Sequence, residues 1–175
     1  MTQNRIGTTE FAVTPPSKVP LVFMASLLVI TIVAVALTGI LDPDSGLSWP
    51  AVLIVAGIEA PIFLGLVLLM RWRRVWLEPG ELVVRATFYL KRTPLSAIDC
   101  SRLRILDLRE HPEAKTVLRT NGVGLPGFSA GHFRDRGKRK VFALVTRPRV
   151  LLIPLTDDSR ILLSLEHPRE LMNRL

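Results

Sequence analysis

Hydrophobic and polar positions divide the chain into a polar start, two long apolar runs and a section of alternating residues. The runs Leu21–Leu41 and Ala51–Met70 are 21 and 20 residues long and together contain one ionisable side chain, Glu59. At about 1.5 Å of rise per residue, each would form a helix about 30 Å long, which matches the hydrocarbon core of a bilayer. We therefore predict a transmembrane hairpin over residues 20–70, with helices at 21–41 and 51–70.

The polar start, residues 1–19, shows no apolar periodicity and contains the pair Pro15-Pro16. We predict a disordered cytoplasmic lead here. Removal of the first run as a signal peptide is an alternative, because Ala34-Val35-Ala36 has the small residues of a cleavage site. The apolar run is longer than the usual signal core of about 7–15 residues, which favours a membrane span.

Charges beside the two runs predict how the hairpin is oriented. The loop between them, Asp42–Trp49, is acidic, whereas Lys18 precedes the first run and several arginines follow the second. By the positive-inside rule, both termini of this multi-pass chain lie in the cytoplasm. Tryptophan and arginine residues at the run ends are predicted interfacial anchors: Trp49, Arg71, Trp72, Arg73 and Arg74.

Glu59 lies near the middle of the second run, where a carboxylate is costly and commonly functional. Small residues form one stripe on each helix: Gly57, Pro61 and Gly65 on the second, Thr31, Ala34 and Thr38 on the first. If these stripes face each other, Glu59 points away from its hairpin, and we predict that Glu59 and Pro61 contact another helix. The alternatives are a protonated or snorkelling carboxyl, or packing by the opposite face with a threonine bonded to Glu59.

From Val75 onward the apolar residues alternate with period two, which is typical of strands. Glu78-Pro79-Gly80-Glu81 predicts a hairpin turn, and Pro168 begins a terminal helix with Leu171 and Leu175 on one face. Further short strands are predicted at 82–86, 87–90, 94–98, 103–108, 132–135, 141–146, 150–155 and 161–165. We expect a mainly β domain over residues 75–175, a strongly bent sheet or barrel of about seven strands capped by the C-terminal helix.

Positive charge is concentrated in this domain. The whole chain carries a formal net charge of +8, and residues 71–175 hold 21 Lys and Arg against 11 Asp and Glu. Five cations are grouped in one predicted hairpin, and each could contribute about 1 kcal/mol near an anionic leaflet: Arg134, Arg136, Lys138, Arg139 and Lys140. They are candidate anionic-lipid contacts, with a solvated turn as the alternative. No nucleic acid partner is expected, because no basic stripe alternates with aromatic residues.

The remaining candidate motifs do not indicate catalysis. Gly122, Gly124 and Gly127 have the spacing of a dinucleotide fingerprint, but Pro126 interrupts it and a strand is predicted to follow where a helix would be needed. We predict instead a loop that passes close over the sheet. The single Cys100 is expected to be a buried or idle thiol. The sequence indicates no catalytic residues, no metal ligands and no cofactor.

Several segments of the β section resemble the bacterial pleckstrin-homology-like (PH) domains, many of which are fused to one or two membrane spans. They are 91–98 (KRTPLSAI), 119–127 (RTNGVGLPG), 131–133 (GHF), 142–146 (FALVT), 151–154 (LLIP) and 161–168 (ILLSLEHP). The resemblance implies a seven-stranded bent β structure with a C-terminal helix and without catalytic residues. We expect a non-enzymatic interaction module in the bacterial inner membrane that binds a protein partner or itself at the cytoplasmic face. Anionic-lipid recognition by residues 134–140 is the alternative.

Overall fold

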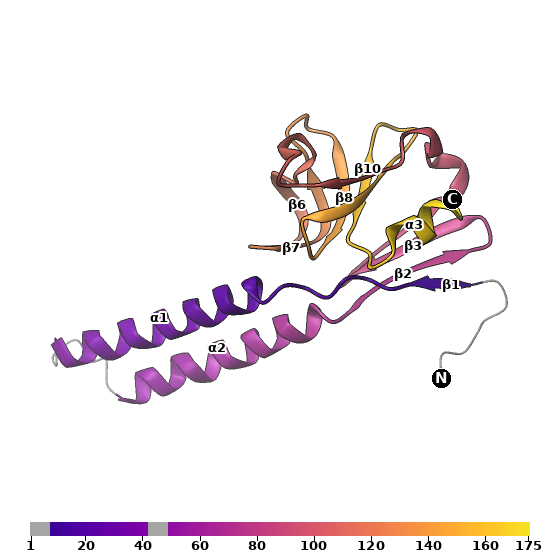
Figure 1. Ribbon diagram of the computed structural model, residues 1–175. Helices are drawn as coiled ribbons and strands as arrows, with labels where there is room; N and C mark the ends of the chain where they lie inside the picture. Colours follow the sequence, from indigo (N-terminus) through magenta and orange to yellow (C-terminus); the bar gives the residue numbers. More distant parts are fainter. Residues whose placement is uncertain (1–7, 42–48) are drawn as a thin grey trace. The chain divides into compact units, whose positions relative to one another are not determined.

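The computed structural model describes residues 8–41 and 49–175 (Figure 1). Its described residues form two compact units, an apolar helical hairpin at Lys18–Arg71 and a β domain made of residues 8–17 together with Trp72–Leu175. The β domain thus contains chain segments from both sides of the hairpin. The predicted loop Asp42–Trp49 lies outside the described residues except for Trp49.

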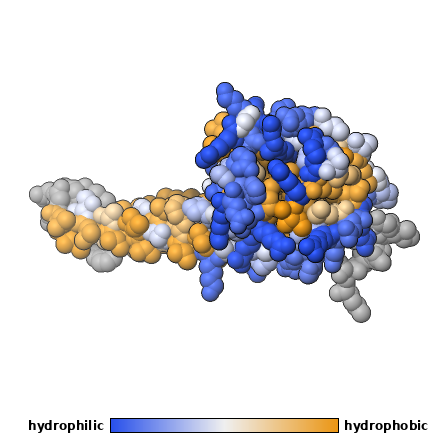
Figure 2. All heavy atoms as spheres, turned by 45° about the horizontal axis from the view of Figure 1, so that its top comes forward, coloured by the Kyte–Doolittle hydropathy of each residue, from blue (hydrophilic) through white to orange (hydrophobic). Residues whose placement is uncertain are grey.

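The hairpin consists of α1 (Val19–Leu41) and α2 (Trp49–Leu69). Both helices are long and apolar enough to cross a membrane, and their bounds agree with the prediction to within two residues. Figure 2 shows hydrophobic residues along the hairpin and hydrophilic residues over much of the visible face of the β domain. The two helices indicate that the chain is associated with a membrane.

The first sheet is antiparallel, with strand order β1-β2-β3-β4. Its bounds are Thr9–Phe11 (β1), Arg73–Glu78 (β2), Glu81–Ala86 (β3) and Tyr89–Pro94 (β4). The predicted turn between β2 and β3 is confirmed, because Glu78 pairs with Glu81 and Gly80 adopts a left-handed φ of 85°. Glycine adopts this φ without the steric cost that other residues meet.

The prediction of a disordered lead is wrong for residues 8–17. β1 pairs with β2, with Thr9 opposite Leu77 and Phe11 opposite Val75. Phe11 is buried, and Thr14 N donates to Ser164 O over 3.0 Å. These residues gain their order from a partner strand more than 60 positions later, a contact that local periodicity does not report. Residues 1–7 lie outside the described part of the chain.

The second sheet has six strands in the order β5-β9-β10-β8-β7-β6, and β10 runs parallel to β8. Its strands are Arg104–Asp107 (β5), Leu118–Leu125 (β6), Phe128–Arg134 (β7), Lys140–Val145 (β8), Arg149–Pro154 (β9) and Arg160–Leu163 (β10). Three short 3₁₀ helices lie in the connections. η2 (Leu95–Ala97) and η3 (Cys100–Arg102) lie between β4 and β5, and η4 (Pro112–Ala114) lies between β5 and β6. The predicted C-terminal helix is α3 (Pro168–Met172), and its Leu171 is fully buried.

The central strands of the second sheet are buried on both faces, which explains why β8 and β9 read as continuous apolar runs. One face of β8, including Val141 and Ala143, belongs to a buried cluster with Leu106 and Leu162. Phe142 points to the opposite face, toward Lys91 of the first sheet. The domain is therefore mainly β, as predicted, and its described residues form ten strands in two sheets.

Two local predictions differ from the structure. The strand expected at 94–98 is largely η2, and the glycine-rich loop is instead the hairpin of β6 and β7, with its turn at Gly127, where φ is 75°. The close approach expected there occurs at Gly131, where an added Cβ would lie 2.7 Å from Asn121 O and 2.9 Å from Tyr89 Cδ2. Glycine at this position lets the two sheets approach each other.

Candidate functional site

The predicted basic hairpin is the turn between β7 and β8. Asp135 N donates to Arg139 O over 3.1 Å, and Lys138 N donates to Asp135 O over 3.0 Å. Lys138 has a left-handed φ of 60°. The backbone therefore turns tightly within five residues and brings the charged side chains of the run close together.

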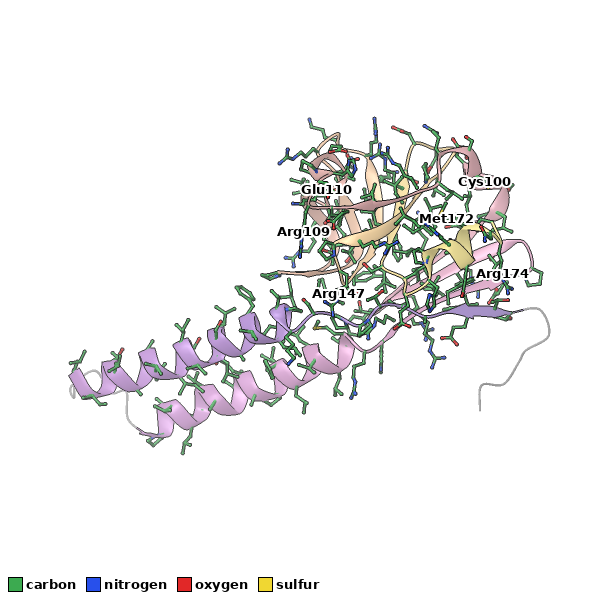
Figure 3. All side chains as sticks on the ribbon, viewed as in Figure 1. Cys100, Arg109, Glu110, Arg147, Met172 and Arg174 are labelled. Atoms are coloured by element: carbon green, nitrogen blue, oxygen red, sulfur yellow. The ribbon has the colours of Figure 1, made fainter. Side chains whose placement is uncertain are left out.

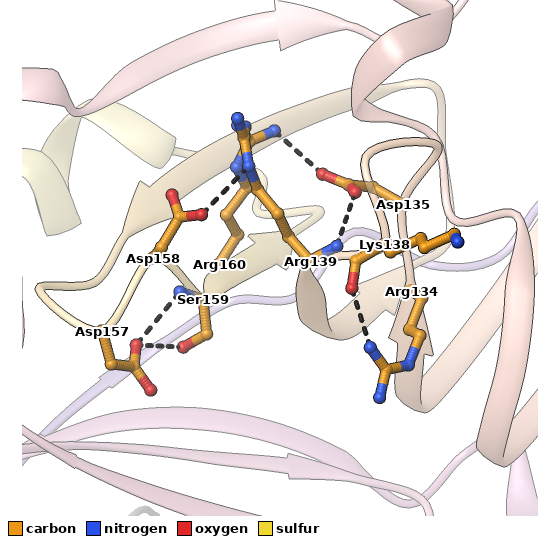
Figure 4. A network of polar contacts seen from close by, with 8 residues as sticks. All are labelled: Arg134, Asp135, Lys138, Arg139, Asp157, Asp158, Ser159 and Arg160. Atoms are coloured by element: carbon orange, nitrogen blue, oxygen red, sulfur yellow. Dashed lines mark hydrogen bonds and ion pairs between the residues drawn. The ribbon is translucent and has the colours of Figure 1, made fainter.

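Asp135 is the buried anchor of this turn, with a side chain only 2% exposed (Figure 4). Its Oδ1 accepts from Arg139 N over 2.9 Å, and its Oδ2 lies 3.3 Å from Arg160 Nη1. Arg160 is the first residue of β10, which pairs with β8. The carboxylate thus holds the turn against a neighbouring strand. The residue pattern does not indicate this role, although Asp135 is the one acid within a basic run.

A second turn, residues 155–159 between β9 and β10, lies beside the first (Figure 4). Asp158 Oδ2 lies 3.2 Å from Arg139 Nε, in a pair whose side chains are largely exposed. Asp157 accepts from Ser159 Oγ and Ser159 N over 2.5 and 3.0 Å, and these bonds lower the pKa of the Asp157 carboxyl. Both turns are therefore fixed by carboxylates.

The two turns border a hollow of about 360 Å³. Arginines from η3, β5, the basic turn and β10 line it: Arg102, Arg104, Arg139 and Arg160. Three of them are paired with carboxylates, namely those of Asp99, Asp158 and Asp135. Within the described residues, Arg104 alone of the four has no ion pair. Most of the positive charge around the hollow is therefore compensated.

The five predicted lipid contacts separate into two groups. Arg139 bonds within the domain, and Arg134 Nη1 donates to Lys138 O over 2.8 Å. The side chains of Arg136, Lys138 and Lys140 are on exposed residues and make no hydrogen bond or ion pair to any residue that the structure describes. Three cations of the run are thus available to a partner.

Lys91 extends the positive potential along the seam between the sheets, and its charge reaches His132. Lys91 Nζ lies 6.0 Å from the Phe142 ring centroid, and burial lowers its pKa, with Lys140 adding to the shift and Asp157 opposing it. Burial, and then the charge of Lys91, lowers the pKa of His132. Cations gathered in this seam disfavour one another's charged forms.

The basic turn lies at one end of β8, far from the chain segment that leads to α1. At the other end, Thr146 Oγ1 donates to Thr14 O over 2.6 Å and Arg147 Nε donates to Pro15 O over 3.2 Å. Six residues of β8 separate the ends, a distance of about 17 Å at about 3.3 Å per residue. We call residues 135–140, 155–159 and η3 the distal end, and residues 13–17, 72–74, 85–90 and 146–148 the tether end.

Figure 3 shows Cys100, in η3, and Arg147 on opposite sides of the β domain. Cys100 is exposed, and its Sγ lies 3.5 Å from Leu175 O. Of the two readings, burial is therefore wrong, whereas an idle thiol stays a prediction. η3 has three residues, which are too few to show the apolar periodicity that predicts burial. The sequence therefore does not indicate whether Cys100 is buried.

The predicted orientation of Glu59 is wrong, because Glu59 faces α1. It lines a pocket of about 180 Å³ between the two helices, together with Thr31 and Leu28 of α1. Glu59 Oε2 is buried and has no hydrogen-bond partner among the described atoms. Thr31 Oγ1 donates instead to Leu27 O over 2.9 Å. The helices therefore pack by the alternative face that the sequence left open.

The small residues of α2 do not form this contact. An added Cβ would meet no atom within 4 Å at Gly57 or at Gly65, and Pro61 is exposed. Larger apolar side chains such as Phe63 and Leu66 line the helix contact instead. They offer more dispersion contact across the interface than glycine does, which accounts for the choice of face.

The predicted interfacial anchors belong to different elements. Trp49 is the first residue of α2, and Arg71 follows that helix. Trp72 is exposed, and Arg73 and Arg74 begin β2. These last three residues are therefore part of the β domain.

Comparison with known families identifies the β section. The family model of the bacterial PH domain matches residues 73–175, which is more than half of the chain. The chain belongs to the bacterial PH domain family. The resemblance of the sequence segments is thereby confirmed, and the bent two-sheet structure with its C-terminal helix is a PH-like fold.

PH domains are generally non-enzymatic interaction modules, and they commonly bind proteins or lipids. The matched region of this PH domain begins at β2 and contains the whole distal end, whereas β1 and the helical hairpin precede it. Neither the comparison with curated proteins nor that with solved structures gave a match.

Proposed function

We propose that this PH domain is a non-enzymatic, membrane-anchored module that binds a protein partner, or a second copy of itself, through its distal end at the cytoplasmic face. The observation that carries the proposal is the position of Arg136, Lys138 and Lys140, which lie at the end of the domain opposite the tether end. Cations placed away from the membrane connection suit an acidic surface on a partner in the aqueous phase.

Pairing of β1 with β2 supports the two-span topology. β1 precedes α1 and β2 follows α2, yet both strands belong to one sheet. Since one folded sheet lies on one side of a bilayer, the chain must cross an even number of times between the two strands. Signal-peptide cleavage near Ala36 would remove β1 from the sheet, so retention of α1 is favoured. The charges of Lys18 and Arg71 favour the cytoplasmic side.

Anionic-lipid recognition by residues 134–140 has less support than protein binding. Two of its five cations, Arg134 and Arg139, are bonded within the domain. The turn is also separated from the tether end by the full length of β8. Surface attraction to an anionic leaflet falls off within a Debye length of about 8 Å at physiological salt, which is shorter than that separation.

The test is affinity purification of the tagged full-length chain after chemical cross-linking in native membranes. One variant neutralises the distal end with Arg136→Gln, Lys138→Gln and Lys140→Gln. A matched control makes the same change in net charge with Arg109→Gln, Arg149→Gln and Arg169→Gln, three exposed residues away from the basic turn. We expect a stoichiometric partner, or a cross-linked homo-oligomer, that the control retains and the distal variant loses.

Two results would contradict the proposal. If both variants retain the same cross-linked species, the distal end is not the contact surface. If the purified chain carries only anionic lipid, and the distal variant alone loses it, lipid recognition is the function of the basic turn.

A further inference from the structure

The turn between β3 and β4 exposes an aromatic ring at the tether end. It consists of Thr87 and Phe88, and Thr87 has a left-handed φ of 58°. Glycine is the usual residue at such a position, because a β-branched side chain is strained there. The Thr87 side chain is buried and donates to Ala86 O over 2.6 Å. Phe88, in contrast, is 66% exposed, so the strained turn holds a large apolar ring in solvent.

This turn is tied to the chain just beyond α2. Thr87 N donates to Trp72 O over 2.8 Å, and Trp72 is itself 60% exposed. Trp72 follows the last residue of α2, Leu69, by three positions, which is at most about 11 Å of extended chain. The bond therefore keeps Phe88 within a short distance of the point where the chain leaves the apolar hairpin.

The other connection to the hairpin leaves at the same end. β1 runs antiparallel to β2, with Phe11 opposite Val75, so the residues after Phe11 advance alongside the start of β2. Two covalent connections at one end keep that end close to any membrane in which the hairpin is embedded. A turn at the opposite end would have no such constraint.

Charge at this end is also suited to a lipid surface. In the register of the first sheet, Arg85 lies opposite Leu90 of β4 and opposite Arg74, whose Nε lies 3.7 Å from Glu10 Oε1. Leu90 is exposed, like Phe88. Aromatic and aliphatic side chains beside arginines are the composition of segments that lie in the interface of an anionic bilayer.

We propose that the Thr87–Phe88 turn inserts the Phe88 ring into the headgroup region of the bilayer that holds the hairpin, with Arg85 beside anionic lipid phosphates. The inference rests on the anchoring part of the proposed function but is independent of the partner bound at the distal end. It gives the strained turn a role, because strain there orients the ring outward.

The test uses site-directed nitroxide labels in the full-length protein, reconstituted into vesicles that contain one-third anionic lipid. Cys100→Ser removes the single cysteine. Cysteines are then introduced one at a time as Phe88→Cys, Lys138→Cys at the distal end, and Leu53→Cys on the exposed face of α2. Relaxation by oxygen, which collects in lipid, is compared with relaxation by a water-soluble nickel chelate.

We expect the ratio of oxygen to nickel accessibility at position 88 to lie between those at positions 53 and 138, and several-fold above that at 138. A ratio at 88 equal to that at 138 would overturn the proposal, because the ring would then lie in water. Low accessibility to both reagents would also overturn it, because protein would then cover the turn. A water-like ratio at position 53 would instead refute membrane anchoring itself, so the two failures are distinguishable.

Discussion

Replacement of Asp135 should lower the stability of the β domain far more than replacement of its exposed neighbour Asp158. Asp135→Ala removes the partner of Arg160, whose side chain is 17% exposed, and the acceptor of Arg139 N. Loss of one partner from a buried ion pair costs about 3–5 kcal/mol. Because Arg160 keeps some access to water and the pair is 3.3 Å long, we take the lower value, about 3 kcal/mol. At about 4 °C per kcal/mol for a domain of this size, Tm should fall by about 12 °C.

The assay is thermal unfolding of the full-length chain in mild detergent, followed by near-ultraviolet circular dichroism. Trp76 reports on β2, since its Nε1 donates to Glu78 Oε1 over 2.7 Å. Asp158→Ala is the matched control, because Asp158 and its partner Arg139 are 71% and 41% exposed. An exposed pair contributes at most about 1 kcal/mol, so this control should lower Tm by no more than about 4 °C.

A double variant separates the lost pair from general damage. Asp135→Ala combined with Arg160→Met leaves neither charge buried without its partner, and it should recover about half of the lost stability or more. Equal Tm shifts for Asp135→Ala and Asp158→Ala would refute the assignment of Asp135 as the anchor of the basic turn. Absence of recovery in the double variant would refute the ion pair as the cause.

Three further predictions follow from single positions. Glu59→Leu should stabilise the hairpin against denaturing detergent by about 1 kcal/mol or more, because it removes a buried carboxyl oxygen that has no partner among the described atoms. Loss of helicity at a lower detergent concentration than in the unchanged chain would contradict this. Gly131→Ala should lower stability by about 2 kcal/mol in urea, whereas Gly124→Ala, with 3.6 Å to its nearest neighbour, should change it little; equal effects would contradict the close approach. Burial lowers the pKa of His132, so the unfolded chain binds the imidazole proton at a higher pH than the folded chain does. The free energy of unfolding should therefore fall as pH drops below about 6.5. His132→Gln should flatten this dependence in urea titrations at about pH 5 and 7.

Elements with a strong local signal were predicted from the sequence. The bounds of α1 and α2 follow from uninterrupted apolar runs, and the turn at Gly80 follows from a Pro-Gly pair. β8 and β9 were also located, since strands buried on both faces are nearly continuous in apolar residues. In each case the residues that determine the element lie within it.

Elements that depend on distant partners were not predicted. β1 has three residues and owes its order to β2, beyond the whole hairpin. The face by which α2 packs was ambiguous, because its small stripe and its large apolar stripe are both compatible with a helix contact. Only the fit of side chains between the helices decides which face is used, and residue spacing does not encode that fit.

The candidate site shows the same division. The sequence located all five cations of the basic turn, but it did not show that Arg134 and Arg139 bond within the domain. Arg134 donates to the backbone oxygen of Lys138, and Arg139 pairs with Asp158, which comes from the turn between β9 and β10. A count of basic residues therefore overstates the number of cations that a partner can meet, because contacts within the domain engage two of the five.

The position of β8 connects the two proposals. Its Val145 end leads into residues that bond Thr14 and Pro15, and its Lys140 end leads out of the basic turn. A six-residue strand in the middle of a sheet is rigid, so it keeps the two ends a fixed distance apart. The tether end is joined to the hairpin by two chain connections, which restrict rotation of the domain more than one connection would. Aromatic insertion at the tether end and partner binding at the distal end therefore do not compete, and each can be removed by substitution without the other.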